Sequence, residues 1–422
     1  MLAFFFVRRK VLLYIRKMRL LALLLVLSPF VILMAQDHSD CDGKRYRSVI
    51  YEDVDIYKDI KFSEGKTITG KQVELFMDVY TPKGDNSVNR PVIVLGFGGS
   101  FINGKRTDIA WLCEEYAKRG FVAVSMDYRL YDLPLIPFPS AGDMQTVVVK
   151  SVVDMNRALQ FLIDDASSSN TYGIDTSALF VGGVSSGSIM ACHTAMLDED
   201  DNLPSYIINK LRSEGLTTDS TTLLGSKDIK GVINFSGALH IGDWYESSDP
   251  PLFSCHDDFD ATVPYKSGYG QVFGQNIVEL EGSFILDSVA NARGMNSELI
   301  TIPNSAGHVS YFTNDAQRNE IIQKSAVFMY ELLCSDRTDV TNIREKFNVS
   351  ITPNPFTIDL RVDLSETDWI QVELLDLAGK VIMTDNLFSD GICFKTDSLS
   401  KGVYIVRISF ENKVIVKKVI KE

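Results

Sequence analysis

The sequence predicts an α/β domain with a mostly parallel sheet and helices on both faces, followed by a small all-β sandwich. Short, continuously apolar runs recur up to about residue 302, and such runs are typical of strands buried on both faces. Segments with helical periodicity separate these runs, as the crossovers of a parallel sheet require. Beyond residue 347 the pattern changes to short alternating segments with turn signals, which indicates a separate β-sandwich.

The elements of the α/β part are predicted in a regular order. Two alternating segments, 48–61 and 71–80, indicate an antiparallel pair at a sheet edge. The buried strands predicted after them are 91–95, 121–126, 178–184, 229–235, 251–255 and 297–302. The predicted helices are 109–119, 144–164 and 186–196, with further helices between and after the later strands.

An insertion at 198–228 interrupts this alternation. Its acidic run, 198–202, indicates a solvated loop rather than a calcium site, because the spaced glycine and terminal glutamate of an EF-hand are missing. Because the insertion directly follows the helix 186–196, it is a candidate cap over a site at that end of the sheet.

Composition and charge restrict the class of protein. The chain has 422 residues and a formal net charge of −13. This acidity argues against a nucleic-acid partner, because no basic stripe is present to neutralise phosphates. Basic residues precede an apolar run that ends at Ala35, which predicts a cleaved signal peptide and no stable membrane span after processing. Met18 is an alternative start.

The expected organisation is a signal peptide at 1–35, an α/β domain at 45–335, a linker at 336–346 and the sandwich at 347–422. Export permits disulfide bonds, but the pairing of the cysteines stays open. Cys113 and Cys192 lie in helix-like apolar patterns and are expected to be buried free thiols. No small-residue lipoprotein box precedes Cys41, so we expect no lipid anchor there.

The sequence Gly-Val-Ser-Ser-Gly at 183–187 lies between a predicted strand and a predicted helix. This context predicts a sharp turn that exposes the hydroxyl of Ser185, whereas the bare pentapeptide is also compatible with an ordinary Gly/Ser-rich loop. A serine hydroxyl becomes a good nucleophile when a histidine takes its proton and a carboxylate orients that histidine.

His308 is the best candidate for the base among the five histidines. It ends a loop after the last buried strand, at the carboxyl edge where open α/β sheets bind ligands. His240 is the competitor, and a packed loop histidine is the alternative for either. His193 lies two turns along its helix and is expected to point away from Ser185, and His38 lies at the processed terminus.

The acid and the oxyanion donors have candidates on two other loops. Asp257, Asp258 and Asp260 follow a strand and lie between the serine and the histidine in chain order, but their spacing does not choose among them. The glycine-rich loop at 95–101 allows backbone N–H groups to face a substrate oxygen. A phosphate-binding loop is the alternative, but no Walker-type Lys-Ser/Thr follows.

Residues from about 49 to 334 resemble an α/β-hydrolase of the carboxylesterase and hormone-sensitive-lipase-like type. The resemblance is carried by the motifs at 183–187, 98–101 with Gly104, 127–130, 256–260 with Val263 and Pro264, and 306–308. It implies an α/β-hydrolase fold with three catalytic residues and three oxyanion donors. These are Ser185 as nucleophile, Asp260 as acid, His308 as base, and the N–H groups of Gly98, Gly99 and Ser186.

This sequence departs from the family pattern at three positions. Phe97 and Ser100 replace the first histidine and the third glycine of His-Gly-Gly-Gly. Asp257 replaces the glycine of the acid motif, which leaves Asp257 as a rival to Asp260.

The C-terminal part resembles the sorting domain of bacterial type IX secretion. The resemblance is carried by Thr-Pro-Asn-Pro-Phe at 352–356, Leu-Leu-Asp-Leu-Ala-Gly-Lys at 374–380, Gly-Val-Tyr at 402–404 and the lysine-rich end. It implies Sec export through the periplasm, outer-membrane translocation by the type IX machinery and removal of this domain, with the protein secreted or at the cell surface. A carbohydrate-binding or spacer sandwich is the alternative.

The expected function is a secreted serine carboxylic-ester hydrolase that works through an acyl-enzyme and needs no metal or organic cofactor. A serine peptidase of similar fold and a non-catalytic binding protein are the alternatives. Trp244 and Tyr245 are candidates for lining an acyl or sugar pocket, and packed loop aromatics are the alternative. The substrate stays open among polysaccharide-linked acetyl or feruloyl esters, lipids and polyesters.

Overall fold

The computed structural model describes residues 41–198, 201–215, 229–334, 350–363, 370–376, 380–387, 392–410 and 413–422. The predicted signal peptide (1–35), the alternative start and the predicted linker (336–346) lie outside these residues. Within the described part of the chain, no helix is long and apolar enough to cross a membrane.

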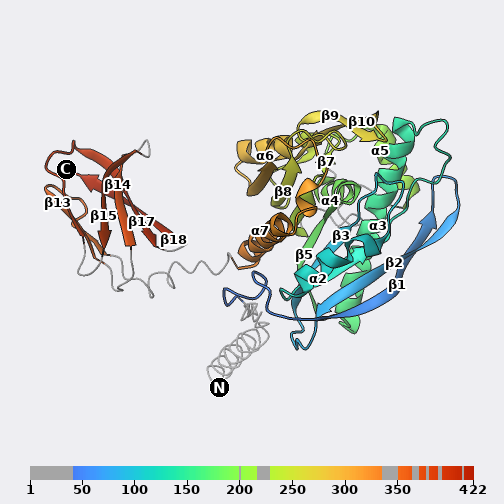
Figure 1. Cartoon of the computed structure of the whole chain (residues 1–422), viewed down its shortest axis with the longest axis horizontal. Coiled ribbons are helices and arrows are strands. Elements are labelled where there is room, and N and C mark those ends of the chain that lie inside the picture. The colour runs from blue at the N-terminus through green and yellow to red at the C-terminus, as the bar shows by residue number, and fades with distance from the viewer. Residues whose placement is uncertain are drawn as a thin grey trace, which may run out of the picture. The chain divides into compact units, whose positions relative to one another are not determined.

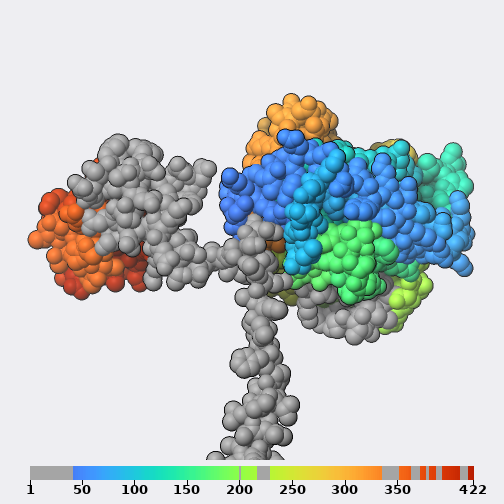
Figure 2. Space-filling view, turned by 90° about the horizontal axis from the view of Figure 1, so that it is seen from below, coloured from blue at the N-terminus to red at the C-terminus, as the bar shows by residue number. Residues whose placement is uncertain are grey.

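An eight-stranded sheet forms the centre of the first domain, in the order β1-β2-β4-β3-β5-β6-β8-β11 (Figure 1). The strands are β1 (Val54–Lys66), β2 (Gln72–Pro82), β3 (Arg90–Gly96), β4 (Val122–Met126), β5 (Ile174–Val184), β6 (Ile229–Phe235), β8 (Leu252–Asp257) and β11 (Ser297–Ile302). β1 and β2 pair antiparallel at one edge, and the other six strands are parallel. The fold class and the edge pair are therefore confirmed, although β1 begins later than predicted. Figure 2 shows the start of the domain, in blue, running across one face of its surface.

The helices cover both faces of this sheet. On β5, Gly183 packs against Gly187 of α4 (Ser186–Met196), and on β6, Gly231 packs against Phe180 of β5 and Leu332 of α7 (Asp315–Cys334). Because alternate residues of a strand point to opposite faces, Gly183 and Phe180 place α4 and α7 on opposite sides of the sheet. α2 (Ala110–Ala117) lies beside α7, and α3 (Ala141–Ser168) lies beside α4.

Burial explains why the central strands could be recognised in the sequence. Every residue of β3 and of β4 is buried, because helices cover both faces of these strands. α3 is recognisable for another reason, since a capping box marks its start. The Asp143 amide donates to Ser140 Oγ at 3.1 Å, and the Ser140 amide donates to the Asp143 carboxylate at 3.2 Å.

A second, three-stranded sheet lies in a region where the sequence predicted helices. It has the order β7-β10-β9 and consists of β7 (Ala238–Leu239), β9 (Ser267–Val272) and β10 (Gln275–Gly282). Along the chain, the helix α6 (Ser283–Ala292) follows β10 and precedes β11. β9 contains Gly268 and Gly270, which have no side chain to pack, so its pattern did not predict a strand.

The described part of the insertion, 201–215, contains one amphipathic helix, α5 (Ser205–Ser213). Its Ile207 and Leu211 are buried, and its polar residues face outward. Residues 199–200 and 216–228 of the predicted cap lie outside the described part.

The C-terminal part is all-β, as predicted. One sheet has the order β12-β13-β16, and the other has the order β15-β14-β17-β18. The strands are β12 (Ser350–Thr352), β13 (Asp359–Asp363), β14 (Ile370–Leu375), β15 (Val381–Leu387), β16 (Ile392–Lys395), β17 (Gly402–Phe410) and β18 (Lys413–Lys421). Leu360, Val372 and Val406 belong to one hydrophobic core that both sheets share, which is the arrangement of a β-sandwich.

The six cysteines divide into two groups. Cys113, Cys192, Cys255 and Cys393 are free, and the first three are buried, which confirms the prediction for Cys113 and Cys192. Cys41 and Cys334 are both disulfide-bonded.

Candidate active site

The predicted site residues meet at one edge of the central sheet. The chain leaves β3 for β4 on one side and returns to β5 on the other, so a topological switch point lies between β3 and β5. Open α/β sheets bind ligands outside the carboxyl ends of the strands at such a point. The glycine-rich loop follows β3, Ser185 follows β5, and Asp260 and His308 lie on the loops after β8 and β11.

Ser185 occupies a strained turn between β5 and α4. Its backbone has φ 56° and ψ −120°, a conformation that L-residues rarely adopt. The turn is possible because three glycines pack closely around it: a Cβ on Gly183 would lie 2.5 Å from the backbone of Gly187, and one on Gly187 would lie 2.1 Å from that of Gly96. Gly96 is a third required glycine that the sequence motif did not reveal. The turn holds the Ser185 side chain at the sheet edge.

Ser185, His308 and Asp260 form a continuous series of hydrogen bonds. His308 Nε2 lies 2.7 Å from Ser185 Oγ, and His308 Nδ1 lies 2.6 Å from Asp260 Oδ2. Because the carboxylate can only accept, the Nδ1–H donates to Asp260 and leaves Nε2 to accept the serine proton. The other oxygen of Asp260 accepts from the amides of Thr262 and Val263 at 2.8 and 3.1 Å. The structure thus brings together the three residues that the sequence singled out.

The environment keeps Asp260 ionised. Burial raises the pKa of this carboxyl, but hydrogen bonds from His256 and His308 outweigh burial and lower the pKa to about 2. A carboxylate that stays ionised can orient His308 and stabilise its protonated form.

Asp257 and Asp258 hold the histidine loop instead of contacting His308. The buried Asp257 accepts from the hydroxyls of Ser305 and Ser310 and, at 3.0 Å, from the Ser310 amide. Asp258 accepts from the amides of Asn304 and Ser305 at 3.0 and 2.9 Å. The three neighbouring carboxylates therefore divide the work, and only Asp260 reaches the histidine ring.

His240 and His193 have other partners. His240 Nδ1 lies 2.8 Å from the carbonyl of Glu279. His193 Nδ1 lies 2.8 Å from the Ile189 carbonyl, and its Nε2 accepts from the His240 amide at 3.1 Å. Burial lowers the pKa of His193 to about 4. Among the described residues, no group of three or more His, Cys, Asp or Glu side chains is arranged to hold a metal ion.

The loop after β3 makes a tight turn beside Ser185. Gly99 has φ +136°, and a Cβ there would lie 2.1 Å from the carbonyl of Asn103. A Cβ on Gly98 would lie 3.3 Å from that of Ser185, so the loop lies directly against the serine. Among the hydrogen bonds of the described residues, none is donated by the amides of Gly98, Gly99 or Ser186. These amides are therefore available to a substrate oxygen.

Two aromatic residues support this loop. The Tyr128 hydroxyl donates to the Phe97 carbonyl at 2.7 Å and lies 3.2 Å from Ser186 Oγ. The rings of Phe97 and Tyr128 stack at 4.3 Å. Phe97, which departs from the family pattern, thus packs in the interior and leaves its backbone to shape the loop.

A mainly apolar cavity adjoins Ser185. It is lined by residues of the glycine-rich loop, α3, α4, α5, β9 and β10, with few polar groups near the serine. The apolar lining includes Phe101, Met144, Val148, Val152, Ile207, Leu211, Trp244, Val278 and Leu280. Trp244, one of the two candidates for a pocket aromatic, is part of this lining. Tyr245, in contrast, is fully buried outside this lining, and its hydroxyl donates to the Pro250 carbonyl at 3.1 Å.

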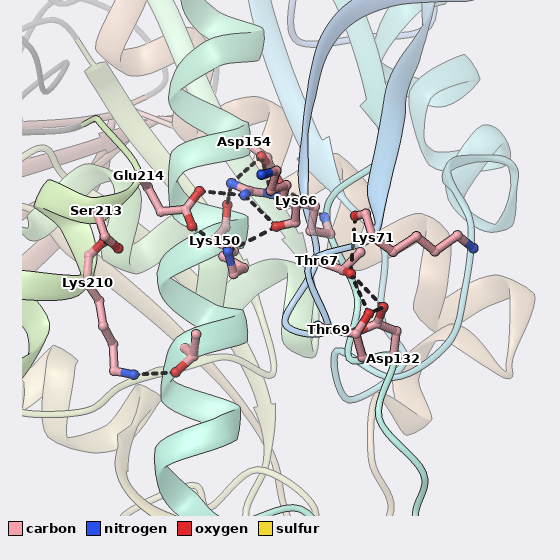
Figure 3. A network of polar contacts seen from close by, with 12 residues as sticks. Lys66, Thr67, Thr69, Lys71, Asp132, Lys150, Asp154, Lys210, Ser213 and Glu214 are labelled. Atoms are coloured by element: carbon pink, nitrogen blue, oxygen red, sulfur yellow. Dashed lines mark hydrogen bonds and ion pairs between the residues drawn. The ribbon is translucent and has the colours of Figure 1, made fainter.

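An ion-pair network fixes α5 against the rest of the cavity wall. Glu214, at the end of α5, pairs with Lys150 of α3 and at 2.5 Å with Arg129 (Figure 3). Arg129 also pairs at 2.8 Å with the fully buried Asp154 of α3. One turn earlier, Lys210 donates to Thr146 of α3. No sequence pattern predicted these contacts, because they join segments that are far apart along the chain.

Comparison with known families agrees with both parts of the fold. Residues 77–249 match the family model BD-FAE, and residues 350–422 match the family model described as "Secretion system C-terminal sorting domain". The chain therefore combines an α/β-hydrolase domain with a C-terminal secretion sorting domain, as the two resemblances in the sequence implied.

Solved structures with a similar arrangement include esterases. Native esterase 2 of the planctomycete Thermogutta terrifontis is 20% identical, with 71% of this chain and 97% of that chain covered and a TM-score of 0.42. The same esterase phosphoramylated by tabun is 18% identical, with 66% of this chain and 94% of that chain covered and a TM-score of 0.44. A truncated carbohydrate esterase from gut microbiota is 16% identical, with 66% of this chain and 96% of that chain covered and a TM-score of 0.44.

Proposed function

Since the chain is an α/β-hydrolase with a C-terminal secretion sorting domain, we propose that it is an exported serine esterase with an acyl-enzyme intermediate. The observation that carries this proposal is the series Ser185–His308–Asp260, with distances of 2.7 and 2.6 Å. Ser185 is the nucleophile, His308 the general base and Asp260 the group that orients His308. Contact with the type IX machinery and release at the cell surface or outside belong to the same proposal.

In the first half of the reaction, Ser185 Oγ attacks the ester carbonyl carbon while His308 Nε2 accepts the hydroxyl proton. The amides of Gly98, Gly99 and Ser186 stabilise the negative oxygen of the tetrahedral intermediate. The C–O bond to the alcohol then breaks, and the alcohol leaves with the proton from His308. In the second half, a water molecule gives a proton to His308 and attacks the acyl-enzyme, which releases the carboxylic acid and restores Ser185.

The cavity supports a substrate with an apolar acyl group. Its lining beside Ser185 is dominated by aliphatic and aromatic side chains, with Trp244 among them. Because each buried CH₂ contributes about 0.8 kcal/mol, a longer acyl chain should raise kcat/KM by about fourfold per methylene until the cavity is full.

A labelling experiment tests the proposed chemistry. The full chain should react covalently with a fluorophosphonate probe at Ser185, and Ser185→Ala should not react. No labelling of the wild type would reject both the esterase and the serine peptidase. Turnover of p-nitrophenyl acetate, butyrate and hexanoate without turnover of p-nitroanilides would favour the esterase, and the opposite pattern would favour the peptidase.

A further inference from the structure

A second set of hydrogen bonds connects the nucleophile helix to Asp260 without passing through His308. Its members are fully buried and come from four different elements. We call them the buried polar chain: Ser188 of α4, Asn234 of β6, Ser283 of α6 and His256 of β8. Burying a polar group costs free energy unless the group is hydrogen-bonded. We therefore expect each polar atom of this chain to have a partner, and we assign donors and acceptors on that basis.

The first part of this chain leads from α4 to His256 Nδ1. Ser188 Oγ donates to Asn234 Oδ1 at 2.7 Å, and Asn234 Nδ2 donates to Ser283 Oγ at 3.1 Å. Ser283 Oγ lies 2.7 Å from His256 Nδ1. Ser283 Oγ accepts from the amide and keeps its own proton free, so it is able to donate to Nδ1 when the imidazole carries its proton on Nε2.

The other ring nitrogen points toward Asp260. His256 Nε2 lies 3.1 Å from the Val263 carbonyl and 3.4 Å from Asp260 Oδ2. Both of these oxygens can only accept, so Nε2 carries the proton. This tautomer leaves Nδ1 as the acceptor for the Ser283 hydroxyl, so the neutral ring satisfies its partners on both sides. Asp260 Oδ2 thus faces the N–H groups of two histidines, His308 at 2.6 Å and His256 at 3.4 Å.

We propose that His256 is a positioning residue for Asp260, and that the buried polar chain sets its tautomer from the nucleophile helix. His256 holds the carboxylate oxygen in the direction of His308, while Ser283 keeps the His256 proton on the side of the carboxylate. The kinetic consequence rests on the proposed esterase function, whereas the geometric consequence at the His308–Asp260 hydrogen bond does not.

The same hydrogen bonds could serve only to join four elements of the core. The two roles differ in what happens at His308. If His256 positions the carboxylate, removing its N–H leaves Asp260 a stronger acceptor, which stabilises protonated His308 and moves the acid limb of kcat/KM to higher pH. Other titratable groups around Asp260 and His256 are Cys255, Asp257, Asp258, Tyr265 and Tyr311, and the variants below leave all of them in place.

The experiment combines proton NMR with pH–rate profiles of the full chain. The His308 Nδ1–H signal is identified by its loss in His308→Ala. In His256→Leu we expect this signal to move downfield, the acid limb to move to higher pH, and kcat/KM to fall about tenfold, the usual effect of losing one buried hydrogen bond. His256→Gln, whose amide N–H can replace Nε2–H, should restore all three readouts toward wild type.

Two further variants keep the test decisive. Ser283→Ala releases the tautomer without emptying the histidine site and should change the readouts in the same direction, also if His256→Leu fails to fold. Ser254→Ala is the matched control, because the buried Ser254 Oγ also accepts from Asn234 Nδ2, at 3.0 Å, but lies off the route to His256. It should lower only the melting temperature.

The outcome that overturns the inference is also defined. If His256→Leu and Ser283→Ala behave like Ser254→Ala, with the NMR signal and the acid limb unmoved, His256 has only a structural role. If the signal moves but the wild type neither hydrolyses esters nor reacts with the fluorophosphonate, the proposed function fails and the positioning role stands.

Discussion

At the scale of single residues, three neighbouring carboxylates have different tasks that chemistry alone does not distinguish. Asp260 contacts the His308 ring, whereas Asp257 and Asp258 bind the loop that carries it. This division depends on where β8 ends relative to β11. Substitution of each aspartate can therefore separate the orientation of the His308 ring from the stability of the loop that carries it.

Asparagine substitutions should separate the three aspartates. We expect Asp260→Asn to lower kcat on the order of 10⁴-fold with little change in KM, because the His308 tautomer is no longer fixed. Asp257→Asn should lower the free energy of unfolding by about 1–3 kcal/mol, because buried hydroxyls lose an acceptor. Asp258→Asn should change both quantities least, because Asp258 is only half-buried, whereas Asp257 and Asp260 are buried. Steady-state kinetics and urea unfolding measure these effects. Equal losses of kcat in all three variants would contradict the division.

The lowered pKa of Asp260 predicts a pH dependence of stability. Because this pKa falls from 3.8 to about 2 on folding, the carboxylate stabilises the fold fully above pH 3.8, and this contribution is lost as the pH falls through about 2. The total is about 2 kcal/mol. The difference in unfolding free energy between the wild type and Asp260→Asn should therefore shrink as the pH falls from 5 toward 2. A difference that stays constant over this range would show that the folded-state pKa is not lowered.

At the scale of elements, the apolar cavity beside Ser185 is assembled from parts that lie apart in the sequence. α3 supplies one wall, α5 a second, and β9 and β10 a third. α5 is short, so its position depends on the contacts of Glu214 with Arg129 and Lys150 (Figure 3). We therefore propose that the ion pairs support the wall of this cavity, although none of these charged groups lines it.

Removing the charge of Glu214 should change selectivity for chain length more than reactivity. In Glu214→Gln, we expect α5 to lose part of its packing against an acyl chain, and about 1 kcal/mol of lost contact corresponds to a fivefold higher KM for p-nitrophenyl hexanoate. KM for the acetate and labelling by the fluorophosphonate should stay near wild type. Glu320→Gln, which removes an exposed ion pair with Lys324, is the matched control. An equal rise of KM for both esters would argue against a role of α5 in the acyl site.

At the scale of the whole molecule, two hydrophobic cores are built independently. Among the described residues, the core of the α/β domain and the core of the sandwich have no residue in common. The sorting-domain match covers residues 350–422, and the BD-FAE match covers residues 77–249 of the α/β domain. Catalysis and export are therefore expected to be separable along the chain.

A truncated chain tests this separation. We propose that a protein ending at residue 346 folds and keeps the kcat/KM and the melting temperature of the α/β domain, because all elements that carry its site end by Cys334. In the producing cell, the same truncation should prevent release across the outer membrane. Enzyme assays of purified protein and of cell fractions measure the two effects. Loss of the melting transition on truncation would mean that the sandwich stabilises the hydrolase domain.

The sequence alone determined the fold class, the edge pair, the central strands and the candidates Ser185 and His308, and it left three neighbouring aspartates as candidates for the acid, of which the family resemblance favoured Asp260. These predictions rest on local causes: strands buried on both faces are apolar throughout, and a strained turn between strand and helix requires small residues. The short alternating segments with turn signals after residue 347 identified the second, all-β domain in the same way.

Only the tertiary structure decided which carboxylate faces His308, that Tyr245 lies outside the cavity, and that Ser283 and Asn234 connect His256 to the nucleophile helix. It also revealed the β7-β10-β9 sheet, whose glycines weaken the strand pattern. One physical reason covers the contacts of His308 and His256. Hydrogen bonds between side chains depend on where strands end in space, and partners that lie 27 to 123 positions apart leave no periodic trace in the sequence.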